Sequence, residues 1–213
     1  MEAEDFHLGA RVVASDGKEI GELVHVLVDS DYKLQAAVVK ENRAFSGFFL
    51  SPGSLLVNDE FILPLDAIKS VDHERVDLSL ASTDARRLQA YIGYREKGES
   101  VAEEAEDFAA VLGSGPEIPH WVEQVANKSA GELEIDRDEN VMLGHTGKKL
   151  GIVKDVLFEG DELVGVVLRP DGLFRQEVIL PRRFLERSDD AALFAQLDEA
   201  AIAGLTPFRP SDA

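Results

Sequence analysis

One stretch of this sequence occurs twice, and the repeat constrains the fold more than any other feature of the chain. Residues 16–39 return in modified form as residues 146–168. The shared positions are glycines, lysines and apolar residues: Gly17, Lys18, Ile20, Gly21, Val26 and Leu27 match Gly147, Lys148, Leu150, Gly151, Val156 and Leu157. Further along, Ile62-Leu63-Pro64 matches Ile179-Leu180-Pro181. A repeat that extends over a whole module predicts that the chain contains two copies of one small domain.

The residues inside each copy have the pattern of β-strands. Apolar side chains alternate with polar ones over residues 22–28 and 33–39, where β-branched residues are dense and helix-forming residues are sparse. Residues that favour tight turns separate the strands, so each copy is predicted to be an antiparallel meander. Gly21 and Gly151 fall inside strands, where glycine is typical of a bulge or sharp bend. Such bends allow a short sheet to curl and close into a small barrel.

The motif formed by these residues resembles a known family. The Gly-Lys-x-Ile/Leu-Gly segment, the apolar strand after it and the Ile-Leu-Pro segment are similar to the PRC-barrel domain, over residues 6–80 and about 140–188. This family includes the cytoplasmic part of the photosynthetic reaction centre H subunit and the C-terminal domain of the ribosome maturation factor RimM. The resemblance implies a compact antiparallel β-barrel that serves as a docking or assembly module, with no catalytic residues to carry over.

The predicted fold is mainly β, with two small antiparallel PRC-type β-barrels from an internal duplication and with connecting and C-terminal helices. We expect a first barrel module at residues 1–80, a helical, acidic linker region at 81–139, a second barrel module at 140–188, and a C-terminal helix and tail at 189–213. Helices are predicted from Ser82, around Trp121, and after Ser188, where Leu193, Phe194, Leu197 and Ile202 recur at helical spacing.

Two groups of residues are candidates for binding a partner. The first copy has 12 extra residues between its matched strands, and they include the aromatic residues Phe45, Phe48 and Phe49. These aromatics either cover a barrel edge or form an exposed patch for a partner. Arg182 and Arg183 directly follow the second Leu-Pro step. They either hold an acidic protein surface or an RNA phosphate, or pair with the protein's own carboxylates.

The sequence carries few signs of other chemistry. It contains no cysteine, and its five histidines never fall at the helical spacing of a zinc pair, so no metal site is expected. Residues 136–140 begin like a calcium loop, but Val141 stands where glycine is needed. No nucleophile elbow is present, so we expect no cofactor and no enzymatic activity. Without a long apolar run or a signal peptide, the chain is predicted to be cytoplasmic with no membrane span.

Charge narrows the class of partner. The net charge of −19, from 22 basic and 41 acidic side chains, disfavours binding to duplex nucleic acid. The sequence therefore favours a non-catalytic protein that binds another protein, or a second copy of itself, as an assembly module. Two alternatives stay open at this stage. One is an RNA- or ribosome-associated factor of the RimM type, and the other is a small-molecule-binding protein with a site between the two barrels.

Overall fold

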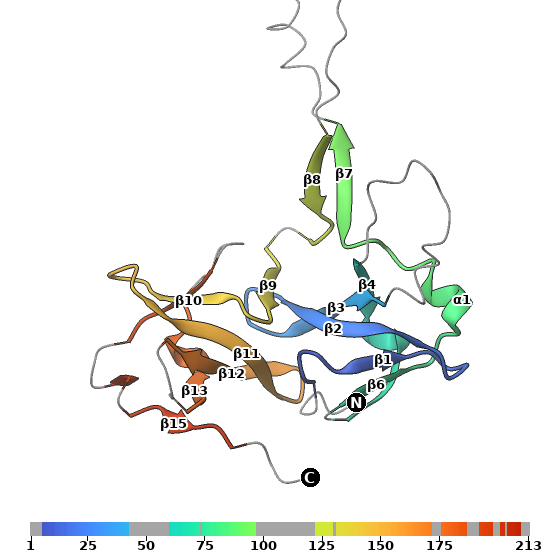
Figure 1. The fold of residues 1–213 in the computed structure, drawn as a ribbon. Coiled ribbons are helices and arrows are strands. Elements are labelled where there is room, and N and C mark those ends of the chain that lie inside the picture. Colours follow the sequence, from blue (N-terminus) through green and yellow to red (C-terminus); the bar gives the residue numbers. More distant parts are fainter. Residues whose placement is uncertain are drawn as a thin grey trace, which may run out of the picture.

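The structure is a computed structural model that describes residues 6–42, 60–72, 74–96, 122–129, 131–171, 176–186, 192–197, 201–202 and 204–209. Within these ranges the chain is mainly β, as the sequence predicts (Figure 1). The described strands form a sheet of seven strands, a sheet of six strands and a two-stranded ribbon. The two larger sheets are strongly twisted and lie against each other, and the ribbon projects away from them.

The first sheet has the strand order β4-β3-β2-β1-β6-β5. Its members are β1 (Arg11–Val13), β2 (Glu19–Val28), β3 (Leu34–Glu41), β4 (Glu60–Pro64), β5 (Ile68–Asp72), β6 (Arg75–Leu78) and β9 (Leu133–Asp136), which pairs with the second half of β2. A short 3-10 turn, η2 (Leu65–Ala67), follows β4, and the α-helix α1 (Ser82–Ala85) follows β6. The ribbon consists of β7 (Ile92–Glu96) and β8 (Val122–Ala126).

The second sheet has the order β14-β10-β11-β12-β13-β15. Its members are β10 (Asn140–Leu143), β11 (Lys149–Glu159), β12 (Glu162–Pro170), β13 (Val178–Pro181), β14 (Leu193–Ala195) and β15 (Thr206–Pro207). As in the first half, a 3-10 turn follows the Ile-Leu-Pro strand, here η3 (Arg182–Phe184). Pro64 and Pro181 precede these turns with nearly the same backbone angles, φ −70° and −63°. Proline favours such an entry because its ring fixes φ near that value.

The long hairpins of the two halves share the positions of their bulges. The register between β2 and β3 shifts between Leu23 and His25, and the register between β11 and β12 shifts between Val153 and Asp155. A second shift follows at the end of each long strand, after Leu27 and after Leu157. Each bulge adds twist and bends the strand, which explains why both hairpins curl.

In each half, the segment that precedes the first strand packs against the other half. Strand β9, just ahead of β10, pairs antiparallel with β2, so that Asp136 lies opposite His25. In the opposite direction, residues 6–10 lie against β11, where the Leu8 N–H donates to Asp155 Oδ1 at 2.9 Å. The Phe6 ring there meets the Phe158 ring edge-on, with centroids 6.5 Å apart. The two halves are therefore interlocked rather than tethered side by side.

The turns of the two long hairpins also meet each other. The Leu34 N–H donates to the Asp161 carbonyl at 2.8 Å, and the Leu163 N–H donates to the Tyr32 carbonyl at 2.9 Å. One continuous apolar core runs through both halves and includes Phe6, Leu23, Ile135, Leu163 and Leu180, each at most 1% exposed. Since these residues come from both sheets, burial of the core depends on both halves together.

Two of the three predicted helices are strands in the structure, and the third is present but shorter than expected. Leu193–Ala195 form strand β14, which pairs parallel with β10, and of the described residues nearby only Ala201 and Ile202 are helical. Leu193 and Ala195 are buried on one face, so they follow the period of a strand, and their backbone pairs with β10 at the edge of the second sheet. Val122–Ala126, after Trp121, are strand β8 rather than a helix. The helix predicted from Ser82 does begin there but ends at Ala85, and from Ile92 onward the chain pairs with β8 instead of continuing as a helix.

Candidate functional site

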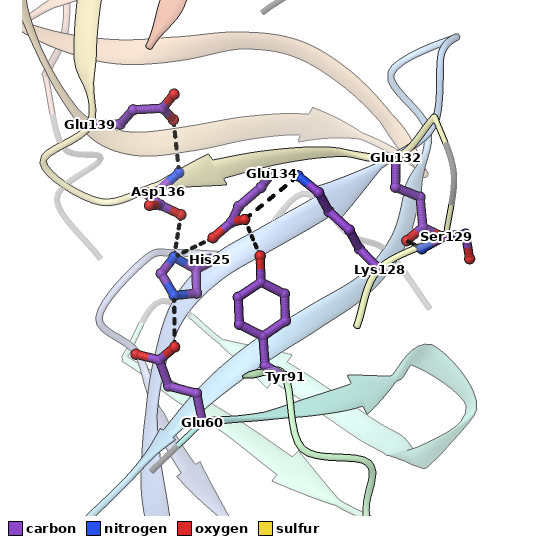
Figure 2. Close-up of polar contacts among 9 residues, drawn as sticks. All are labelled: His25, Glu60, Tyr91, Lys128, Ser129, Glu132, Glu134, Asp136 and Glu139. Carbon is purple, nitrogen blue, oxygen red and sulfur yellow. Dashed lines mark hydrogen bonds and ion pairs between the residues drawn. The ribbon is translucent and has the colours of Figure 1, made fainter. Parts of the chain in front are cut away.

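His25 lies at the bulge of β2, where that strand is flanked by β3 and β9. It pairs with Val38 on one side and with Asp136 on the other. Because Leu23 and Val26 both point into the core, the bulge between them directs His25 out of the apolar interior. Its side chain remains 15% exposed and lies among the acidic side chains of β4 and β9 (Figure 2).

Carboxylates contact both nitrogens of the His25 ring. Nδ1 lies 3.5 Å from Glu134 Oε1 and forms a closer ion pair with Asp136 Oδ1. On the opposite side of the ring, Nε2 lies 3.5 Å from Glu60 Oε2. The side chains of Glu60 and Glu134 are only 21% and 17% exposed. Three acidic groups from two strands therefore surround one imidazole.

A second layer of contacts holds these carboxylates in place. The Tyr91 hydroxyl donates to Glu134 Oε2, and Lys128 Nζ lies 3.8 Å from the same oxygen. The Tyr91 ring is also 5.6 Å from the His25 ring between centroids. The Asp136 backbone N–H donates to Glu139 Oε2 at 3.1 Å. Figure 2 shows these side chains converging from β2, β4, β9 and the segments around Tyr91 and Lys128.

The surroundings change the pKa values of the cluster. Burial lowers the pKa of His25, but contacts with Asp136 and Glu60 and the charge of Glu134 outweigh it and raise that pKa to about 9. Burial raises the pKa of Glu134 to about 7, with Asp136 adding to the rise and the Tyr91 hydrogen bond opposing it. The contact with His25 lowers the pKa of Glu60. At neutral pH, His25 is therefore a cation held between carboxylates.

We expect the protein to lose stability as the pH rises from 6.5 to 9. Since the pKa of His25 rises from 6.5 to about 9 on folding, its stabilising contribution is complete below pH 6.5 and is lost as the pH passes 9. The loss is on the order of 3 kcal/mol in the free energy of unfolding. Urea denaturation at pH 6, 7.5 and 9.5 in a chelating buffer measures it. The raised pKa of Glu134 also makes the protein lose stability as the pH rises, but this loss occurs at lower pH, between 4.5 and 7.

His25→Gln removes this pH dependence between 7.5 and 9.5, whereas the control His7→Gln keeps it. His7 is a suitable control because its side chain has the same 15% exposure and also contacts a carboxylate. If wild type and His25→Gln lose stability equally over this range, His25 is not held as a cation by the cluster.

A related but simpler pair occupies the corresponding place in the second half. His7 Nδ1 lies 2.6 Å from Asp155 Oδ2. Asp155 follows the bulge of β11, just as His25 follows the bulge of β2. His7 comes shortly before β1, the first strand of its half, just as Asp136 comes shortly before β10. The other carboxylate oxygen of Asp155 accepts the Leu8 N–H. The imidazole and the carboxylate have thus exchanged positions between the two halves.

Of the site residues predicted from the sequence, Arg182 and Arg183 lie on η3. The Arg182 guanidinium lies 5.1 Å from the centroid of the Tyr32 ring, and Arg183 lies 4.8 Å from that of Phe184. Tyr32 belongs to the first half, and its hydroxyl donates to the Glu186 carbonyl in the second at 2.9 Å. Within the described part of the chain, no carboxylate forms an ion pair with either arginine. The alternative that they pair with the protein's own carboxylates therefore has no support from the described residues, and their role as binding residues stays a prediction.

The other predicted site residues, Phe45, Phe48 and Phe49, lie outside the described residues. Their role as an interaction patch stays a prediction. The structure instead brings together His25, Glu60, Glu134 and Asp136, none of which the sequence analysis selected.

Comparison with known proteins bears on the first half. Residues 8–78 match the family model of the PRC-barrel domain, a range that runs from just before β1 to the end of β6 and includes His25 and Glu60. No curated protein matches the chain. In the described parts of the chain, no helix is long and apolar enough to cross a membrane. The family match, which spans β1 to β6 and the bulged hairpin of β2 and β3, identifies residues 8–78 as a PRC-barrel domain.

Proposed function

We propose that this protein is a non-catalytic assembly module made of two PRC-type units. The recurrence of the bulges, of the 3-10 turns after Pro64 and Pro181, and of the reciprocal exchange of segments supports a second unit at residues 140–188. A PRC-barrel domain is in general a module for protein interaction and assembly. Two interlocked units present a larger rigid surface than one, which suits docking of a partner.

The observation that carries this proposal is the pair of arginines at the junction of the two halves. Arg182 is half-buried against Tyr32, and Arg183 is exposed. Packing on an aromatic ring holds a guanidinium in place while its N–H groups remain available for carboxylates. In a chain with a net charge of −19, neither of these arginines has a carboxylate partner among the described residues. We propose that they bind an acidic segment of a partner protein through paired N–H···O contacts.

Charge also favours a protein over RNA as the partner. An acidic peptide brings a few carboxylates to one basic spot, whereas an RNA backbone extends its phosphates across the acidic surface around it. Arginine and tyrosine are also the residues that most often dominate binding energy at protein interfaces. Arg182, Tyr32 and Arg183 therefore form the proposed docking surface.

Reversing the charge of both arginines should abolish capture of the partner. Each lost guanidinium contact to a carboxylate is worth about 1.5–3 kcal/mol, so Arg182→Glu/Arg183→Glu weakens binding by at least about 100-fold. The test is affinity capture of the tagged full-length protein from native lysate at low and high salt, with and without nuclease. A partner identified in this way is then purified, and its Kd is measured against wild type and variant.

The matched control is Arg86→Glu/Arg87→Glu, which makes the same change in net charge beside α1, where Arg87 pairs with Asp84 at 3.6 Å. The proposal requires the partner to persist with this control and to disappear with the Arg182/Arg183 variant. If both variants lose the partner equally, the total charge of the protein alone would explain the loss. If the partner disappears on nuclease treatment, the RNA-binding alternative would be favoured. Capture of a second copy of this chain, checked by sedimentation, would identify the acidic partner as the protein itself.

A further inference from the structure

We propose that the cluster around His25 is a binding site for a divalent transition-metal ion, with Zn²⁺ as the preferred occupant. The ligands would be His25 Nδ1, one oxygen of Glu134 and one oxygen of Asp136, which leaves an open position for water or for a group from a partner. This inference does not depend on the docking surface at Arg182 and Arg183, because the two sites use different residues.

The donor atoms already converge. One nitrogen of His25 and one oxygen each from Glu134 and Asp136 lie within 4.8 Å of one another. Tetrahedral Zn²⁺ with bonds of about 2.0–2.1 Å separates its ligand atoms by about 3.4 Å. The 3.5 Å between His25 Nδ1 and Glu134 Oε1 fits that separation. Asp136 lies nearer to the ring, and its side chain, 37% exposed, has room to move outward.

Among the described residues, three buried polar atoms of this cluster lack a well-aligned hydrogen bond. Both ring nitrogens of His25 and Asp136 Oδ1 are inaccessible to solvent, and none of them has a well-aligned hydrogen bond within the described structure. Buried polar atoms in folded proteins nearly always have such a partner, and an ion or ordered water is a common reason when they do not. A metal ion bound between His25 and Asp136 would satisfy two of these three atoms.

The surrounding residues are arranged as they are around metal ligands. Glu60 contacts Nε2 of His25, the nitrogen opposite the proposed metal, which is the carboxylate–histidine–metal arrangement that fixes an imidazole ring. Tyr91 and Lys128 contact Oε2 of Glu134, so that Oε1 is the oxygen left facing the ring. The ligands lie on β2 and β9, which are paired strands, and rigid elements hold such a site with more precision than loops.

Charge and ligand type select the kind of ion. Binding of the metal to Nδ1 would displace the proton that His25 carries in the metal-free protein. With the imidazole then neutral and the carboxylates ionised, Glu60, Glu134 and Asp136 bring three negative charges against one positive charge from Lys128. A divalent ion balances the remaining two. An imidazole nitrogen with two carboxylates suits zinc and manganese, whereas calcium and magnesium prefer oxygen ligands only.

The experiment uses full-length protein after removal of metal with EDTA. Titration calorimetry with ZnCl₂ should show one ion per chain at micromolar or tighter Kd, and Co²⁺ should give the visible absorption bands of a low-coordinate site. Glu134→Gln and Asp136→Asn each remove one charged ligand and should weaken Zn²⁺ binding by about 100-fold, and Tyr91→Phe, which only positions Glu134, by about tenfold. His25→Gln should abolish the Co²⁺ bands.

His7→Gln is the matched control, since the His7–Asp155 pair has the same exposure but only one described carboxylate contact. Its Zn²⁺ affinity should equal that of wild type. The proposal fails if Zn²⁺ binds with no defined stoichiometry, if the Glu134 and Asp136 variants bind as tightly as wild type, or if His7→Gln loses as much affinity as His25→Gln. Circular dichroism of each metal-free variant confirms folding, and the near-isosteric Glu134→Gln keeps the test valid if His25→Gln does not fold.

Discussion

Residues 1–129, produced without the rest of the chain, should not fold to a stable monomer. This fragment loses β9, which pairs with β2 from His25 to Val28, and it loses Ile135, a fully buried member of the shared core. Phe6, also fully buried, loses its contact with Phe158. Each large apolar side chain removed from the core or newly exposed costs about 1.5–3 kcal/mol, and several together exceed the stability of about 5–15 kcal/mol that a typical domain has.

The complementary fragment, residues 130–213, should fail for the reciprocal reason. It lacks residues 6–10, which supply the Leu8 N–H to Asp155, and it lacks the turn whose Tyr32 carbonyl accepts the Leu163 N–H. Thermal melts by circular dichroism and amide spectra by NMR measure folding of each fragment. Mixing the two fragments should restore the dispersed spectrum of the intact chain, which separates missing contacts from general misfolding. A cooperative melt of either fragment as a monomer would mean that the exchanged segments are not essential.

Local structure was the part of this fold that the sequence could predict. Alternating apolar residues identified the strands of both long hairpins, and the Gly-Lys turns fall where they were expected. Gly17 and Gly147 both have positive φ, at +79° and +65°, the conformation that favours glycine at a turn. Gly21 and Gly151, predicted to mark bends, lie beside register shifts in β1–β2 and β10–β11. Each of these features depends on residues that are close in sequence, so it recurs wherever the motif recurs.

The exchange between the halves could not be predicted in the same way. Leu133–Asp136 has only four residues and lies in the segment expected to be an acidic linker, yet it pairs with β2. Likewise Leu193 and Leu197 have helical spacing, but pairing with β10 decides in favour of a strand. The preference of short segments for a strand depends on the available partner, which periodicity does not reveal.

The site around His25 was missed for a related reason. His25 and Asp136 are 111 positions apart, so no motif search joins them. The one available signal was the spacing of Glu134 and Asp136, which places both side chains on one face if that segment is a strand. Reading the segment as a linker removed that signal. The expectation that the chain holds no metal rested on helical histidine spacing and cysteine, and neither applies to ligands on paired strands.

Gly21→Ala and Gly151→Ala should each destabilise the protein severely. A Cβ at Gly21 would lie 2.0 Å from the Lys40 carbonyl oxygen, and one at Gly151 would lie 2.1 Å from the Arg169 carbonyl oxygen. Both obstacles are backbone atoms of the paired strand, β3 or β12, so the clash is relieved only by separating strands that the curl holds together. We expect each variant to lose about 3–5 kcal/mol in the free energy of unfolding, above the range of ordinary overpacking.

Urea denaturation of the full chain measures this loss, with Gly17→Ala as the matched control. Nothing lies within 4 Å of a Cβ at Gly17, so that variant is penalised only by its positive φ, at about 1–2 kcal/mol. If Gly21→Ala and Gly151→Ala lose more free energy of unfolding than Gly17→Ala, the extra loss comes from the close approach of the strands and not from backbone conformation. Comparable losses at Gly21 and Gly151 would further indicate that both hairpins use the same close contact to curl. If Gly21→Ala costs no more than Gly17→Ala, the strands separate easily there, and the glycine is not what permits the bend.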